Sequence, residues 1–128
     1  MPKKILFSLM LTALIGVLAA CNKDNEEDSN DVYFVKYEYQ RSGGRITTQI
    51  TYKDTDSERS FTMSGMSWQG TYGPFQRGDT VFMIVRSDAT GYVDWSNFTS
   101  NGTISISKND EPFSVKIAGS GTLEYVIK

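Results

Sequence analysis

Residues 32–40, with the sequence VYFVKYEYQ, decide the fold class, because large apolar and aromatic side chains recur there at every second position. This period of two is typical of a β-strand with one buried and one solvated face. The side chains expected to point inward are Tyr33, Val35, Tyr37 and Tyr39, and those expected to face solvent are Lys36, Glu38 and Gln40. The sequence therefore predicts a half-buried strand at the start of the domain.

Short strand patterns continue from this stretch to residue 127. The further predicted strands cover residues 45–53, 60–66, 80–86, 103–108, 111–118 and 122–127. The unbroken apolar run at 81–85 predicts a central strand covered on both faces, and Asn109 with Asp110 predicts a two-residue hairpin turn. Together these patterns predict an all-β fold: an antiparallel Ig-like β-sandwich of about seven strands over residues 32–128.

The composition of the 128-residue chain excludes several chemistries. It contains no histidine and one cysteine, which removes histidine-based catalysis, an intramolecular disulfide and a zinc site built from several cysteines. Its formal net charge of -2 provides no basic surface for phosphate backbones, so we expect no nucleic-acid partner. We expect one folded domain, without catalytic residues, metal or cofactor.

Residues 1–20 are expected to be a targeting segment. Lys3 and Lys4 precede an apolar run at 5–18, which is shorter than the roughly 20 residues of a membrane-spanning helix and typical of a secretory signal. Residues 18–21, Leu-Ala-Ala-Cys, resemble the lipobox of bacterial lipoproteins. That resemblance implies cleavage before Cys21 and lipidation of its thiol. An ordinary secretory peptide with an incidental cysteine is the alternative.

The lipidated Cys21 would be followed by an acidic flexible tether, residues 21–31. Residues 22–31 hold five acids and one lysine and lack apolar side chains, so they cannot bury surface. Fully extended, they reach about 35 Å. An acidic stretch after the lipidated cysteine also resembles the surface-export signal of Bacteroidetes lipoproteins. It implies display on the outer leaflet of the outer membrane, and a plain spacer is the alternative.

The order of motifs in residues 32–128 resembles a known small β-sandwich. A strand ending in Ile-Thr-Tyr at 50–52 is followed by Trp68, Phe75, the turn 77–79, an apolar strand, Ile-Ser-Ile at 104–106 and Asn109. This order is similar to the domain of the mycobacterial membrane protein small (MmpS) family, and to small Bacteroidetes lipoproteins. The MmpS resemblance implies a non-catalytic accessory of envelope transport or assembly. The chain departs from that family in having a lipidated cysteine as its anchor and a longer connection at 90–101.

Residues 54–58 place three acids at alternate positions, as the start of a calcium loop would. An EF-hand loop also needs glycine at its sixth position and glutamate at its twelfth, where this chain has Arg59 and Gly65. A solvated loop is the favoured interpretation, and a weak calcium site between Asp54 and Glu58, completed from a neighbouring loop, is the alternative.

The remaining acids suggest no enzyme. Glycoside hydrolysis needs two carboxyl groups about 5–9 Å apart across a cleft, and the spacing of Asp79, Asp88, Asp94 and Glu124 singles out no such pair. Ser120 lies between two glycines, as in a turn, and the chain has no histidine to activate it. An envelope hydrolase is therefore the least favoured hypothesis.

Two aromatic-rich segments expected to be loops contain the candidate partner-binding residues. Trp68, Tyr72 and Phe75 belong to the glycine-rich segment 65–78, and Tyr92, Trp95 and Phe98 belong to the second segment. Flat rings stack on sugars and fill pockets of protein partners. For Trp68, a place in the core between the sheets is the favoured alternative. Trp95 has polar neighbours and is the stronger candidate.

These observations lead to a function hypothesis and a rival. The first is a non-catalytic lipoprotein, held in the bacterial outer membrane by its lipid, displayed on the cell surface and binding a protein or glycan. The rival, from the MmpS resemblance, is a periplasm-facing accessory subunit of an envelope transporter or assembly system.

Overall fold

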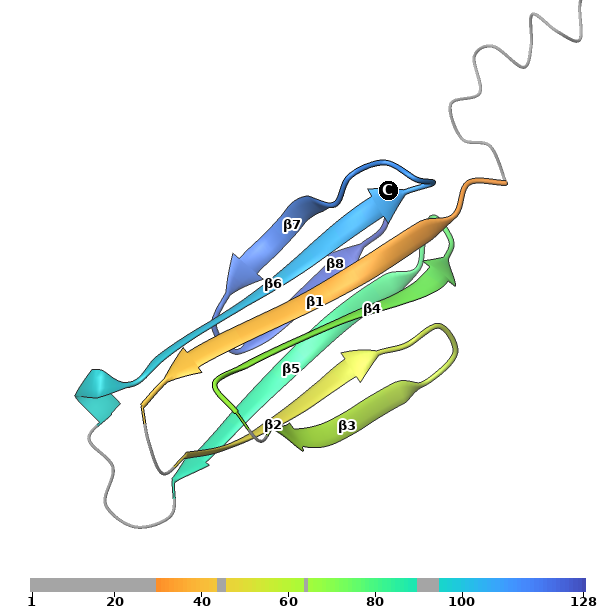
Figure 1. Ribbon diagram of the computed structural model, residues 1–128. Coiled ribbons are helices and arrows are strands. Elements are labelled where there is room, and N and C mark those ends of the chain that lie inside the picture. Colours follow the sequence, from red (N-terminus) through yellow and green to blue (C-terminus); the bar gives the residue numbers. More distant parts are fainter. Residues whose placement is uncertain (1–29, 44–45, 64, 90–94) are drawn as a thin grey trace, which may run out of the picture. The chain divides into compact units, whose positions relative to one another are not determined.

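The structure is a computed structural model that describes residues 30–43, 46–63, 65–89 and 95–128 (Figure 1). Its elements are β1 (Tyr33–Ser42), β2 (Ile46–Lys53), β3 (Glu58–Met63), β4 (Ser67–Phe75), β5 (Thr80–Ala89), the short 3-10 helix η1 (Trp95–Asn97), β6 (Thr99–Lys108), β7 (Ser114–Gly119) and β8 (Thr122–Val126). Among the described residues, no helix is long and apolar enough to cross a membrane.

The strands form two packed antiparallel sheets. Sheet A has the order β4-β1-β6-β7, and sheet B has the order β3-β2-β5-β8. Only the β2–β3 and β6–β7 connections join neighbours within a sheet, so the chain otherwise passes from one sheet to the other (Figure 1). The predicted antiparallel β-sandwich is confirmed, with eight strands in the described residues where about seven were expected.

The additional strand is β4, which the sequence analysis assigned to a loop. Trp68, Gly70 and Tyr72 occupy its inward positions, so a glycine interrupts the apolar alternation that marks a strand. β4 also contains Gly73 and Pro74, and both glycine and proline are depleted in strands. They are tolerated because β4 is the edge strand of sheet A, where a missing backbone donor leaves no ladder bond unmade.

The core lies between the sheets and follows the alternation predicted for β1. Its fully buried side chains come from both sheets and include Val35, Tyr37, Tyr39 and Ile104 of sheet A, and Ile50, Val81 and Met83 of sheet B. Burying each large apolar side chain stabilises the fold by about 1.5–3 kcal/mol relative to leaving it exposed. Burial of the inward side chains of both sheets is therefore what stabilises the packing of one sheet on the other.

The apolar run in β5 is covered on one face only. The strand lies centrally in sheet B, between β2 and β8, as predicted. Val81 and Met83 face the core and are fully buried, whereas Phe82 and Ile84, on the opposite face, are half-buried. The expectation that the strand is covered on both faces was wrong, because each sheet of a two-layer sandwich packs against the other sheet on one side alone.

The β6–β7 hairpin is confirmed, but its connection is longer than two residues. β6 ends at Lys108 and β7 begins at Ser114, so residues 111–113, which were predicted to begin the strand 111–118, lie in the connection. Asn109 adopts a left-handed conformation with φ of 54°. The buried Ser107 hydroxyl donates to the Glu111 carbonyl and stabilises the turn from within.

At Gly102 of β6, sheet A lies against the side chains of sheet B with no room for a further side chain. A β-carbon added to Gly102 would lie 2.5 Å from the Met83 terminal methyl and 3.3 Å from a Leu123 methyl. We expect Gly102→Val to lower the free energy of unfolding by about 1–3 kcal/mol through overpacking. Gly102→Ala should have a smaller effect, because the Met83 side chain can move. Urea denaturation of both variants tests this, and wild-type stability of Gly102→Val would contradict it.

Candidate functional site

Trp68 and Tyr72 do not form an exposed loop, contrary to expectation. Both lie on β4, where Trp68 pairs with Tyr39 and Tyr72 pairs with Val35 of β1. Both are half-buried and pack against the core, and Phe75 at the end of the strand is 1% exposed. The alternative that places Trp68 between the sheets thus describes its position, and β4 presents its polar alternate residues to solvent.

The inward rings of this edge meet in one aromatic cluster, formed by Tyr37, Tyr52, Phe61, Trp68 and Tyr72. Tyr52 is at its centre: its ring centroid lies 4.7 Å from that of Tyr72, 5.3 Å from Trp68, 5.6 Å from Tyr37 and 6.2 Å from Phe61. These are the separations at which aromatic pairs attract one another. The cluster joins β3 and β4, the edge strands of the two sheets.

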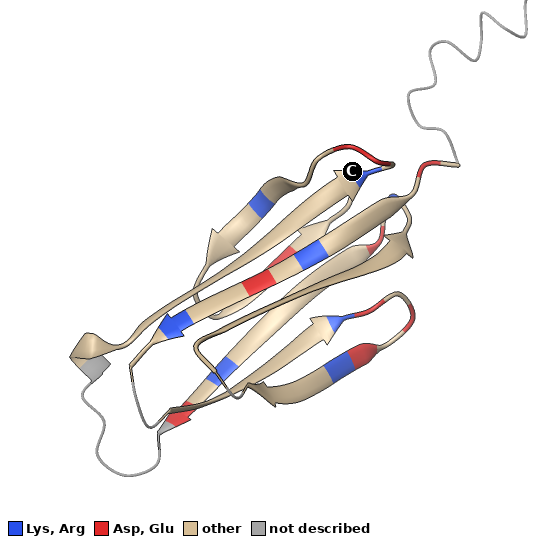
Figure 2. Ribbon diagram, in the orientation of Figure 1, with Lys and Arg blue, Asp and Glu red and all other residues tan. Residues whose placement is uncertain are grey.

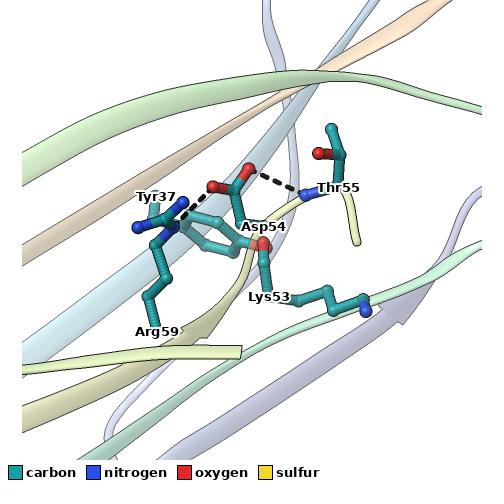
Figure 3. A network of polar contacts seen from close by, with 5 residues as sticks. All are labelled: Tyr37, Lys53, Asp54, Thr55 and Arg59. Atoms are coloured by element: carbon teal, nitrogen blue, oxygen red, sulfur yellow. Dashed lines mark hydrogen bonds and ion pairs between the residues drawn. The ribbon is translucent and has the colours of Figure 1, made fainter. Parts of the chain in front are cut away.

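Two tyrosines of the aromatic cluster are held in their neutral form. The Tyr37 hydroxyl donates a hydrogen bond of 2.6 Å to the Lys53 carbonyl, on the opposite sheet, beside the Asp54 carboxylate (Figure 3). Burial raises the pKa of the Tyr37 phenol above its ordinary value. Burial, and then the neighbouring Tyr52 hydroxyl, raise the pKa of Tyr72. Neither phenol is therefore poised for proton transfer near neutral pH.

The acidic loop after β2 is closed by its own hydrogen bonds. The Asp54 carboxylate accepts a hydrogen bond of 2.7 Å from the Thr55 backbone N–H and one of 2.8 Å from the Arg59 guanidinium (Figure 3). These contacts, the Thr55 bond first, hold the pKa of Asp54 below its ordinary value. In the described part of the chain, no three His, Cys, Asp or Glu residues are grouped so as to hold a metal ion. The Asp54 carboxylate, one of the three acids of the predicted calcium loop, is thus already bonded to Thr55 and Arg59.

The second aromatic segment is described only in part. Tyr92, like Cys21 and the tether up to residue 29, lies outside the described residues, as does the side chain of Trp95. The Trp95 backbone begins η1. Phe98 is half-buried and packs beside the turn after β1, where a β-carbon on Gly43 would lie 3.4 Å from its ring. Phe98 therefore lies against the turn after β1, and its part in binding a partner stays a prediction.

A polar groove crosses the outer face of sheet A. It has a volume of about 540 Å³ and is lined by residues of all four strands. Two rows of side chains form most of it: Gln69, Glu38 and Thr103 in one, and Ser67, Gln40 and Asn101 in the other, each row following cross-strand pairs. Val115 of β7, 61% exposed, closes one side. We call this feature the sheet A groove.

The sheet A groove continues toward the end of β1. A neighbouring hollow of about 250 Å³ shares Gln40 and Asn101 with it and extends to Ser42 and Thr99. The hydroxyls of Ser42 and Thr99 are hydrogen-bonded to each other. Because η1 ends two residues before Thr99, the segment that contains Trp95 adjoins this hollow in sequence.

Charges around the sheet A groove are balanced. Figure 2 shows basic and acidic residues alternating along β1, and acids at the turns that follow β2 and β6. Glu38 is the one carboxylate among the groove-lining residues, and Lys36 lies 3.5 Å from it. Lys36 also lies 5.0 Å from the centre of the Phe113 ring. A single neutralised carboxylate provides no pair of acids for glycoside hydrolysis.

The first residues of the domain are fixed by the turn after β6. The Asn109 side chain accepts a hydrogen bond of 3.1 Å from the Val32 backbone N–H and donates one of 3.1 Å to the Asp31 carboxylate. The other carboxylate oxygen of Asp31 lies 3.4 Å from the Lys108 ammonium nitrogen. We call these four residues the N-terminal clamp. It secures the start of β1, and the sheet A groove lies toward the other end of that strand.

Of the predicted partner-binding residues, Trp68 lines the sheet A groove, and the polar residues that form most of the groove were not predicted. Gln40 and Glu38 were assigned only to a solvent-facing position, and Gln69 to a loop. A usable signal was the amide and hydroxyl side chains at outward strand positions, where Lys and Glu are more usual on a plain solvated edge. Asp79 has a structural role, since its carboxylate accepts a hydrogen bond of 2.9 Å from the Gln76 backbone N–H.

No protein-family model, curated protein or solved structure matches the chain.

Proposed function

We propose that this protein is a non-catalytic lipoprotein of the bacterial outer membrane, anchored through a lipid on Cys21 and displayed on the cell surface. Its β-sandwich binds a partner molecule through the sheet A groove. The lipobox-like residues 18–21 and the acidic tether support the anchor and the surface address.

One observation carries this proposal: the groove is distant from the point where the tether joins the domain. Asp31 lies in the N-terminal clamp, whereas Gln40 lies nine residues further along an extended strand, about 30 Å away. A tether that reaches about 35 Å when fully extended and a groove at the far end of β1 suit capture of a partner away from the membrane. The alternating neutralised charges of sheet A suit neither a phosphate backbone nor a hydrolytic centre.

The test is protease accessibility of the full-length protein on intact cells, with lysed cells as control. We expect digestion on intact cells, together with incorporation of labelled fatty acid. In cells that express Cys21→Ala, the protein should carry no labelled fatty acid and should no longer be found in the membrane fraction, because no thiol remains to be acylated.

Two outcomes would contradict the proposal. Protection from protease until lysis would place the domain inside the envelope and favour the periplasm-facing, MmpS-like accessory of transport. Fatty-acid labelling that persists in Cys21→Ala would remove the anchor from position 21.

A further inference from the structure

We infer that the sheet A groove binds an uncharged glycan chain through the side-chain amides of Gln40, Gln69 and Asn101. This inference rests on the proposed binding function and specifies its ligand class. The three amides come from β1, β4 and β6, and all three residues are exposed.

The shape of the groove admits an extended polar chain. Residues of β4 and of β7, the two edges of sheet A, line the same hollow, so the outer face is concave across three strand spacings, or about 14 Å. Its two rows of side chains lie about 7 Å apart along the strands. The volume of about 540 Å³ is within the range of ligand-binding sites.

The groove offers hydrogen bonds that the protein leaves unused. In the described part of the chain, the amide groups of Gln40, Gln69 and Asn101 bond to no other residue. An amide donates through its nitrogen and accepts through its oxygen, and the hydroxyls of Ser67 and Thr103 do both. Sugar hydroxyls also donate and accept, so a glycan satisfies both functions of each group.

The charges of the groove select an uncharged ligand. The groove lining contains no lysine or arginine, and its one carboxylate, Glu38, is 3.5 Å from Lys36. In the neighbouring hollow, Arg41 donates a hydrogen bond to the Gly43 carbonyl. A phosphorylated or sulfated chain would find no cationic fork of the kind that binds such anions. A glycan without charged groups would lose no ionic hydration on binding.

A protein partner fits this groove less well. Peptides that bind to sheets usually add a strand at an edge and use free backbone groups. Here β1 and β6, the central strands of sheet A, are each paired on both sides, so a ligand in the middle of the groove meets side chains and no free backbone groups. Protein interfaces also centre on buried apolar or aromatic anchors. In this groove the aromatic residues Tyr39 and Trp68 pack toward the core, Val115 lies at the margin, and the other lining side chains are polar.

The test is binding of the full-length lipidated protein, in detergent micelles, to an array of neutral and acidic bacterial and host glycans. We expect retention by at least one neutral glycan and not by its sulfated or phosphorylated counterparts. The double variant Gln40→Ala/Gln69→Ala should bind that glycan at least about tenfold more weakly, because each lost hydrogen bond weakens binding several-fold. Asn101→Ala should give a smaller loss.

The matched control is Gln49→Ala, which removes an exposed glutamine from the outer face of sheet B. Thermal unfolding of every variant separates lost binding from lost folding. No retention by any neutral glycan, or equal binding by the double variant and Gln49→Ala, would overturn the inference. Capture of a protein that is lost in the double variant would also overturn it while leaving the proposed function intact. Protease protection on intact cells would instead remove surface display and leave glycan binding as measured.

Discussion

Replacing Tyr52 with alanine is expected to lower the free energy of unfolding by about 3–5 kcal/mol. The side chain is 7% exposed, and its ring contacts the four other rings of the aromatic cluster. Its removal leaves a cavity where the edge strands of the two sheets approach, and it breaks aromatic pairs worth about 0.5–1.5 kcal/mol each beyond buried area. Since small domains are stable by about 5–15 kcal/mol, such a variant approaches the limit of folding.

The conservative partner of this variant is Tyr52→Phe, which keeps the ring and removes the hydroxyl. We expect it to remain within about 1 kcal/mol of the wild type. Urea denaturation followed by tryptophan fluorescence compares the two, because Trp68 lies 5.3 Å from Tyr52 and reports on the cluster. Equal midpoints for the alanine and phenylalanine variants would mean that the cluster does not hold the sandwich edge.

β1 could be predicted along its whole length because its inward positions all carry large side chains. β1 places Tyr33, Val35, Tyr37 and Tyr39 between the sheets, so period two is visible along its length. β4 has Gly70 at an inward position, and the Tyr72 ring fills the space instead: a β-carbon on Gly70 would lie 2.6 Å from the Tyr72 hydroxyl. The hydrophobic pattern shows only glycine at position 70 and does not reveal that the Tyr72 ring fills the space beside it.

The sheet A groove was beyond prediction for a different reason. Gln69, Glu38 and Thr103 become one row only because β1 lies between β4 and β6, at a register set by long-range pairing. Alternation tells which face a residue occupies, but not which strand lies beside it. The aromatic residues drew attention because their chemistry is conspicuous in the sequence. Trp68 and Tyr72, however, serve the core, and the amides that face solvent are inconspicuous until the strands are arranged.

Raising the pH above about 10 is expected to destabilise the domain, because Tyr37 and Tyr72 are held neutral between the sheets. An unfolded tyrosine has a pKa of about 10, and burial raises the pKa of both phenols in the folded state. Their contribution to stability is therefore fully present below pH 10 and is lost as the pH rises toward the folded pKa. For Tyr37 the loss is about 1.4 kcal/mol per pH unit. Tyr72 is half-exposed and contributes less, because solvent screens it.

Thermal unfolding between about pH 8 and 11 measures this effect. In Tyr37→Phe, stability at neutral pH should fall by about 1 kcal/mol, since the Lys53 carbonyl loses its donor, but the decline above pH 10 should become shallower. Tyr125→Phe, which alters a half-buried tyrosine on β8, is the matched control and should keep the wild-type pH dependence. If Tyr37→Phe and the wild type lose stability in parallel above pH 10, ionisation of Tyr37 does not drive alkaline unfolding.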